Sequence, residues 1–136
     1  MAVPSLYSKR QGALMNEQHN WDKVLEWEKR LDQGEGLTLT PDVVDLLRSV
    51  ARDVAMPEQE AQRALAAPVD AAGLIRGMCH RIRDGSRRLM KAIAEANRRK
   101  DAGDTAGARK LLEDVLAVES VPLYRRHAEA ELSYLE

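Results

Sequence analysis

The sequence of 136 residues contains one cysteine, no phenylalanine and only 4% aromatic residues. Cys79 therefore has no partner for an internal disulfide, and there is no Cys-x-x-Cys pair or Cys/His cluster to hold zinc. A run of about 20 apolar residues is missing, which excludes a membrane-spanning helix. The N-terminal residues lack the apolar stretch of a secretory signal. We therefore expect a cytoplasmic protein.

Catalytic patterns are missing as well. The sequence offers no glycine-rich phosphate loop, paired-carboxylate cleft or Ser/His/Asp arrangement. Cys79 and His80 are adjacent, so on a helix they point about 100° apart, and Cys79 is better explained as a small buried residue. His127 and Glu131 can share a helix face, as a partly buried histidine beside a surface acid, but two ligands do not make a metal site. We expect no enzyme, catalytic residue, metal, cofactor or small-molecule substrate.

Ala, Leu, Glu and Arg are abundant, and these residues lose little side-chain freedom in a helix. With no strand pattern of any length, the sequence predicts an all-α fold, an irregular bundle of about six helices. Residues 1–19 lack apolar periodicity and are expected to form a flexible tail, docked at most through Leu6, Tyr7 or Leu14. Residues 20–136 are expected to form a single helical domain. The first helix should start after Asn20, and the later ones should cover about 41–54, 58–66, 70–100, 106–118 and 123–135.

The longest of these segments contains apolar or small residues at alternating spacings of three and four. They are Ile75, Met78, Ile82, Gly85, Leu89, Ala92 and Ala96. Gly85 could end a helix, with Ser86 capping the next one. The unbroken phase favours one long helix instead, in which Gly85 lies on the apolar face and lets a neighbouring helix approach closely.

Charge is distributed unevenly along this near-neutral chain. Between Arg76 and Lys100 there are nine basic and two acidic residues, whereas residues 1–75 hold eight and twelve, and residues 101–136 hold four and eight. On a helical wheel the basic side chains gather opposite the apolar stripe. The predicted ridge consists of Arg76, Arg83, Arg87, Lys91 and Arg98.

Two interpretations of this ridge stay open. Its charges can be neutralised by acidic segments of the same chain, or they can form an external docking surface. The second interpretation predicts a non-catalytic protein–protein interaction domain of regulatory, inhibitory or immunity type. Its partner would be another protein with an acidic surface or a second copy of the chain, and Trp27 is a candidate aromatic anchor.

A DNA-binding role is the alternative, because residues 43–66 fit a helix-turn-helix pattern. The second helix of that pattern carries Glu58 and Glu60 at its N-terminal end, where phosphates would lie, and only Arg63 is basic. The pI near 6.3 also differs from that of typical DNA-binding domains. Both observations count against nucleic acid, and nothing in the sequence favours a membrane surface.

The C-terminal part resembles a tetratricopeptide-type helical hairpin from Ala92 to about Tyr134. Ala96 and Ala108 occupy the small-residue positions, Gly103-Asp104 the turn, and Pro122 the closing proline. Arg99 stands where the repeat has a large aromatic residue. The match covers one and a half repeats, fewer than the three or so that a stable repeat array needs.

A second resemblance covers residues 21–135. Its segments are Leu31-Asp-Gln-Gly-Glu-Gly-Leu-Thr-Leu-Thr-Pro-Asp-Val, Gly85-Ser-Arg-Arg-Leu-Met and Gly103-Asp104 through Asp114-Val-Leu-Ala-Val-Glu-Ser-Val-Pro-Leu-Tyr124. They resemble the DUSAM family, a paralogous family of small myxobacterial proteins whose function is unknown. The resemblance implies a stand-alone bacterial helical domain and assigns no activity or catalytic residue.

Overall fold

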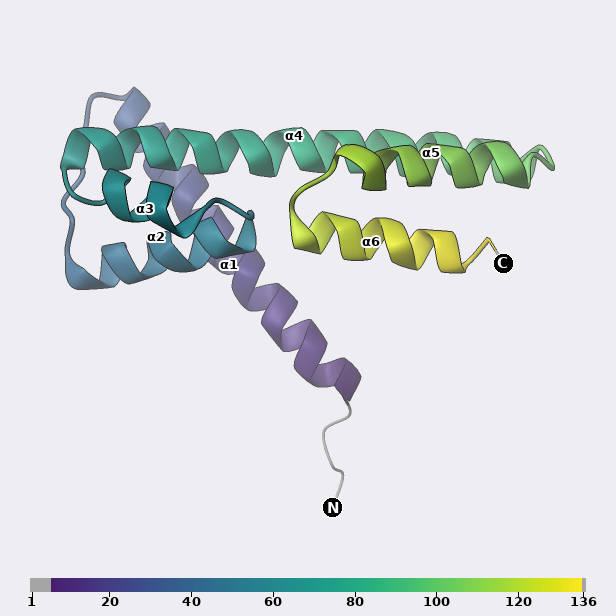
Figure 1. The fold of residues 1–136 in the computed structure, drawn as a ribbon, viewed down its shortest axis with the longest axis horizontal. Coiled ribbons are helices and arrows are strands. Elements are labelled where there is room, and N and C mark those ends of the chain that lie inside the picture. Colours follow the sequence, from purple (N-terminus) through teal and green to yellow (C-terminus); the bar gives the residue numbers. More distant parts are fainter. Residues whose placement is uncertain (1–5, 136) are drawn as a thin grey trace, which may run out of the picture. The chain divides into compact units, whose positions relative to one another are not determined.

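The computed structural model describes the backbone of residues 6–135 and the side chains of residues 19–135. Within that range it contains six helices and no strand, which confirms the predicted all-α class (Figure 1). The helices are α1 (Leu6–Asp32), α2 (Pro41–Asp53), α3 (Glu58–Ala64), α4 (Pro68–Asp101), α5 (Thr105–Val118) and α6 (Pro122–Ser133).

Helix α1 starts much earlier than predicted. It begins at Leu6, so most of the expected tail is helical and the predicted start after Asn20 is wrong. Apolar periodicity is missing there because the residues before His19 are largely polar. Residues 1–5 and the side chains of Leu6, Tyr7 and Leu14 lie outside the described part of the chain, and so does their expected docking.

Two helix starts are capped by polar side chains. Thr40 caps α2, where its hydroxyl oxygen accepts a hydrogen bond from the Val43 N–H at 3.3 Å, and a proline follows at the first helical position. Asp104 caps α5 by accepting from the Gly107 N–H at 2.9 Å. The preceding Gly103 has a φ of +85°, the left-handed conformation that glycine adopts at a helix end.

Helix α4 is continuous through Gly85, so the prediction of one long helix is confirmed. All seven residues of its apolar stripe, from Ile75 to Ala96, are buried. This helix begins at Pro68, two residues before the expected start at residue 70, and the missing N–H of a proline costs nothing at the first helical position.

The chain divides into two compact units, residues 1–79 and 80–136, which we call the first and second unit. The prediction of a single domain over 20–136 stays a prediction. The first unit holds α1, α2, α3 and the start of α4, and its core includes Trp21, Val24, Leu47, Val50, Val54 and Met78. The Cys79 thiol is also buried there and lies 3.7 Å from the Val24 carbonyl oxygen, as expected for a small core residue.

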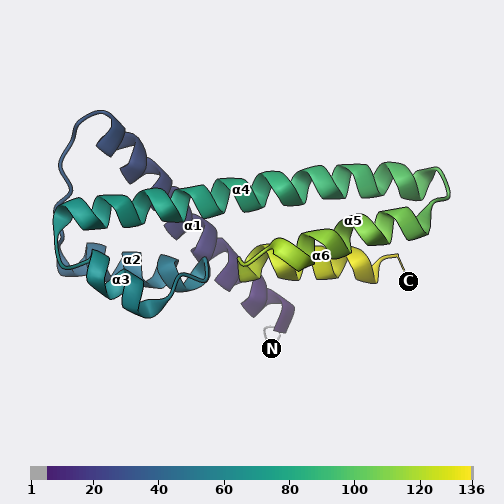
Figure 2. The ribbon, with the colours of Figure 1, turned by 45° about the horizontal axis from the view of Figure 1, so that its top comes forward.

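The second unit holds the rest of α4 together with α5 and α6. Both α5 and α6 lie beside this part of α4 in the two ribbon views (Figure 1 and Figure 2). A buried cluster of Ala96, Ala108 and Leu112 joins the helices, and Ile93, Leu111, Leu132 and Leu135 pack against it. This cluster is the buried contact between α4 and α5 in the second unit.

Candidate functional site

Gly85 on α4 lies against the side chains of Tyr124 and Glu119 in the second unit. A Cβ atom at residue 85 would lie only 2.6 Å from Tyr124 Cε2 and 2.7 Å from Glu119 Oε1. The Tyr124 hydroxyl donates a hydrogen bond to the Ile82 carbonyl oxygen at 2.8 Å, which fixes the ring over the glycine. The predicted close approach at Gly85 is therefore confirmed.

Glu119 is a buried carboxylate that follows the end of α5. Its side chain is only 3% exposed, and it pairs with Arg88, whose Nη1 lies 3.1 Å from Oε1. The other oxygen, Oε2, accepts the N–H groups of Ser120 at 3.0 Å and Val121 at 3.1 Å. Three donors thus compensate for burial of the charge. Arg88 is an internal partner, so part of the basic block is structural.

Burial and the nearby negative charge of Glu119 raise the pKa of Tyr124 to about 12. The phenol therefore stays protonated at neutral pH and remains a hydrogen-bond donor to Ile82. This part of the second unit is a packing and hydrogen-bonding centre.

Arg83, Arg87, Lys91 and Arg98 are exposed along one face of α4 in the second unit, and we call these four residues the basic face. The first three are spaced four apart, so they follow one another along the helix. Arg98 pairs with Glu95 on the same helix. Arg87 and Lys91 form no ion pair with any residue of the described range 19–135.

The other two predicted site residues belong to the first unit. Arg76 is exposed there, and its Nη2 lies 3.4 Å from Asp32 Oδ1. Trp27 is half-buried and lines a small depression with Leu31, Leu37 and Val43. Arg76 and Trp27 therefore belong to a different unit from the basic face. The name basic face is kept for the four residues of the second unit.

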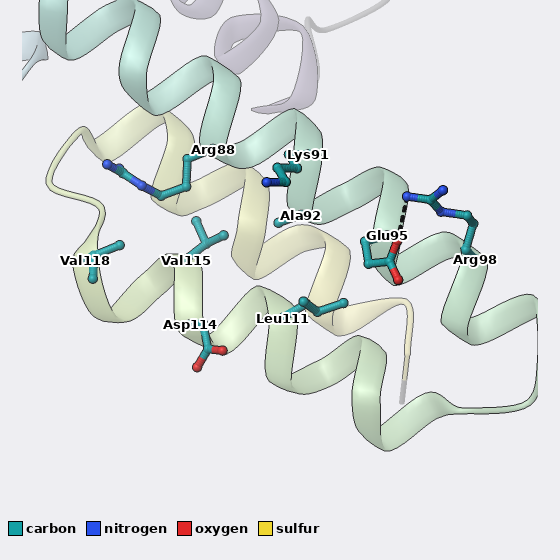
Figure 3. Close-up of a pocket in the computed structure, with 9 residues that line it drawn as sticks. All are labelled: Arg88, Lys91, Ala92, Glu95, Arg98, Leu111, Asp114, Val115 and Val118. Carbon is teal, nitrogen blue, oxygen red and sulfur yellow. Dashed lines mark ion pairs between the residues drawn. The ribbon is translucent and has the colours of Figure 1, made fainter.

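A groove between α4 and α5 was not predicted. It has a volume of about 440 Å³ and is lined by Arg88, Lys91, Ala92, Glu95, Arg98, Leu111, Asp114, Val115 and Val118 (Figure 3). Lys91 and Arg98 belong both to this groove and to the basic face. An apolar stripe in the sequence cannot tell which of its residues border an open groove.

Residues 19–135 match the DUF2379 family, which is described as a protein of unknown function. The chain belongs to this family. The DUF2379 match includes the whole basic face, the groove and the Gly85–Tyr124 contact. No curated protein and no solved structure matches the chain.

Two of the three histidines of this DUF2379 chain lie beside an acidic residue on the same helix. His80 Nε2 lies 3.5 Å from Asp84, and His127 Nε2 lies 3.7 Å from Glu131. The side chain of His127 is about half exposed, which agrees with the expected partly buried histidine. Among the described residues no three His, Cys, Asp or Glu side chains gather as a metal site, and none of the helices is long and apolar enough to cross a membrane.

Proposed function

We propose that the chain is a non-catalytic interaction domain that docks an acidic surface of another protein through the basic face of α4. The observation that carries this proposal is the pair Arg87 and Lys91. Both are exposed and one helical turn apart, and neither forms an ion pair within residues 19–135. Two neighbouring cations without compensation create a positive potential that attracts carboxylates and steers association.

Much of the remaining basic block already has acidic partners. Arg76 pairs with Asp32, Arg88 with Glu119, and Arg99 with both Glu95 and Asp104. The neutralised interpretation therefore holds for these residues and not for Arg87 and Lys91. The proposed docking surface is narrower than the ridge considered from sequence, and it excludes Arg76.

The same surface is compatible with a regulatory, inhibitory or immunity-type role, and with a second copy as the partner. DNA binding through residues 43–66 is the weaker candidate. Helix α3, which would be the recognition helix, has only seven residues and carries Glu58 and Glu60 in its first turn. These acids would repel the phosphates that such a helix must approach.

The proposal is tested by charge reversal with a matched control. The test variant is Arg87→Glu with Lys91→Glu, and the control reverses two exposed basic residues of the first unit, Lys23→Glu with Arg63→Glu. Both double variants have the same net charge. We expect proteins retained by immobilised wild type and by the control to be lost by the test variant, and the Tm to change by less than about 2 °C in each.

Two outcomes would contradict the proposal. One is equal retention of every protein by the test variant and the control. The other is retention of duplex DNA by the wild type that falls steeply with salt and needs residues of α3, which would favour the alternative.

The finer family assignments are also proposals. The DUSAM assignment, and with it a bacterial source, is supported by two of its segments, residues 85–90 and 119–124, which pack on each other at Gly85 and Tyr124. The tetratricopeptide-like character of residues 92–134 is supported by Ala96 and Ala108, which share one buried cluster. A cytoplasmic location is proposed from the sequence alone.

A further inference from the structure

The groove between α4 and α5 has an apolar floor. Ala92 and Val115 are buried in it, Leu111 is half-buried, and Val118 is 65% exposed. Leu111, Val115 and Val118 follow one another at spacings of four and three, so they form one strip along α5. A large apolar side chain left in water at the edge of an apolar groove marks a surface that a partner can cover.

The dimensions of the groove match a short helix. On α4 the lining runs over ten residues from Arg88 to Arg98, about 15 Å, and on α5 it runs over seven residues from Leu111 to Val118, about 10 Å, so the walls are two to three helical turns long. The exposure of Val118 shows that the groove is open along this side. An open groove covers one face of a helix, whereas a small-molecule pocket buries most of its ligand.

The rim of the groove has unequal charges. On the α4 side Glu95 is paired with Arg98, whereas Lys91 forms no ion pair within residues 19–135 (Figure 3). Arg87 lies one helical turn before Lys91. On the α5 side the only charged lining residue, Asp114, is 3.2 Å from Lys110 Nζ and is already paired. An acidic side chain would therefore find its counterion along the α4 rim.

We propose that this groove seats an amphipathic helix of a partner protein, with its apolar side chains on the Leu111–Val118 strip and its acidic side chains along Arg87 and Lys91. The inference rests on the proposed function and names the kind of segment that is docked. Apolar anchors at i, i+4 and i+7 of the partner helix would match the strip on α5. A flank of Glu or Asp on that helix would match the α4 rim.

The probe is a synthetic peptide of about three helical turns, with Leu at i, i+4 and i+7 and Glu along one flank. A peptide of the same composition in scrambled order is the control ligand. We expect fluorescence anisotropy to show binding of the patterned peptide only. Val118→Glu places a charge on the apolar strip and should weaken binding about tenfold or more. Val69→Glu changes a valine that is 83% exposed in the first unit and should leave binding unchanged.

The charge side is tested separately with Arg87→Glu/Lys91→Glu. This variant should also weaken peptide binding about tenfold, and the remaining binding should lose most of its salt dependence. Equal affinity of Val118→Glu and wild type for the peptide would overturn the proposal that the groove binds a helix.

If partner capture then still depends on Arg87 and Lys91, the proposed function stands without the groove. If partner capture does not depend on them, both proposals fail. A dimer that Val118→Glu dissociates would also overturn the inference, because a second copy would then occupy the groove.

Discussion

At the scale of single residues, Gly85 is the position where the second unit depends on the absence of a side chain. Alanine in a helix is more stable than glycine by about 1 kcal/mol, so an unconstrained Gly→Ala change should stabilise the helix. At residue 85 the added methyl would overlap the Tyr124 ring and the Glu119 carboxylate. Neither group can move freely, because Tyr124 is bonded to Ile82 and Glu119 to Arg88.

We predict that Gly85→Ala lowers the free energy of unfolding by about 1–2 kcal/mol, since overpacking costs more than the helix propensity gains. Gly73→Ala is the matched control on the same helix, because a Cβ there meets no atom within 4 Å. That control should gain up to about 1 kcal/mol. Urea unfolding followed by circular dichroism measures both changes. A higher free energy of unfolding in both variants would contradict this prediction, because it would show that Tyr124 and Glu119 can move to make room for the added methyl group.

Residues also show where sequence reasoning reaches its limit. The apolar phase of α4 predicted the burial of Ile75 through Ala96 and the role of Gly85, because helical periodicity is a local property. The partner of Arg88 was not predictable, since Glu119 lies 31 positions away, just after the end of α5, and only the tertiary packing of the second unit brings it near. The groove was missed for the same reason. The groove depends on how α4 and α5 pack, and the apolar pattern of one helix does not contain that information.

At the scale of elements, the start of α5 depends on one carboxylate. The Gly107 N–H, and then a hydrogen bond from Arg99, hold the pKa of Asp104 below its usual value of 3.8. The folded state therefore favours the ionised form, and the unfolded chain binds a proton at higher pH. The stability that this cap contributes is complete above the usual pKa and is lost as pH falls through the lower folded-state pKa.

We predict that Asp104→Asn reduces the loss of Tm between about pH 6 and about pH 2, because the amide oxygen still caps Gly107 but does not titrate. Asp101→Asn changes an exposed acid of the preceding helix that is not a cap, and its Tm should follow the wild-type pH curve. Thermal unfolding monitored by circular dichroism measures all three curves. Parallel curves for Asp104→Asn and wild type would contradict this role of the cap.

Helix ends illustrate the same division between local and non-local information. Thr40-Pro41 and Gly103-Asp104 specified the starts of α2 and α5 almost to the residue, because caps are built from neighbouring side chains. The start of α1 at Leu6 was missed because a polar segment gives no periodic signal. In this sequence capping residues therefore predict the helix starts that they form, whereas a helix start in a polar segment without such a cap is not predicted.

At the scale of the whole molecule, opposite charges are segregated along a chain whose net charge is only −1. Little net repulsion opposes contact between copies, while the basic block of residues 76–100 can attract the acidic segments of another copy. Such attraction is long-ranged at low ionic strength, where the Debye length is about 30 Å at 0.01 M, and is screened at 0.15 M, where it is about 8 Å.

We predict that the second virial coefficient of the wild type, measured by static light scattering at neutral pH, rises as salt increases between these two concentrations. Arg87→Glu/Lys91→Glu replaces two positive charges with two negative ones, which changes the net charge from −1 to about −5. Net repulsion between copies of this variant should then dominate, and its second virial coefficient should fall with salt. A wild-type coefficient that also falls would mean that internal ion pairs such as Arg88–Glu119 compensate the whole block. The opposite signs would instead show that Arg87 and Lys91 contribute to the attraction, as expected for two neighbouring exposed cations that form no ion pair within residues 19–135.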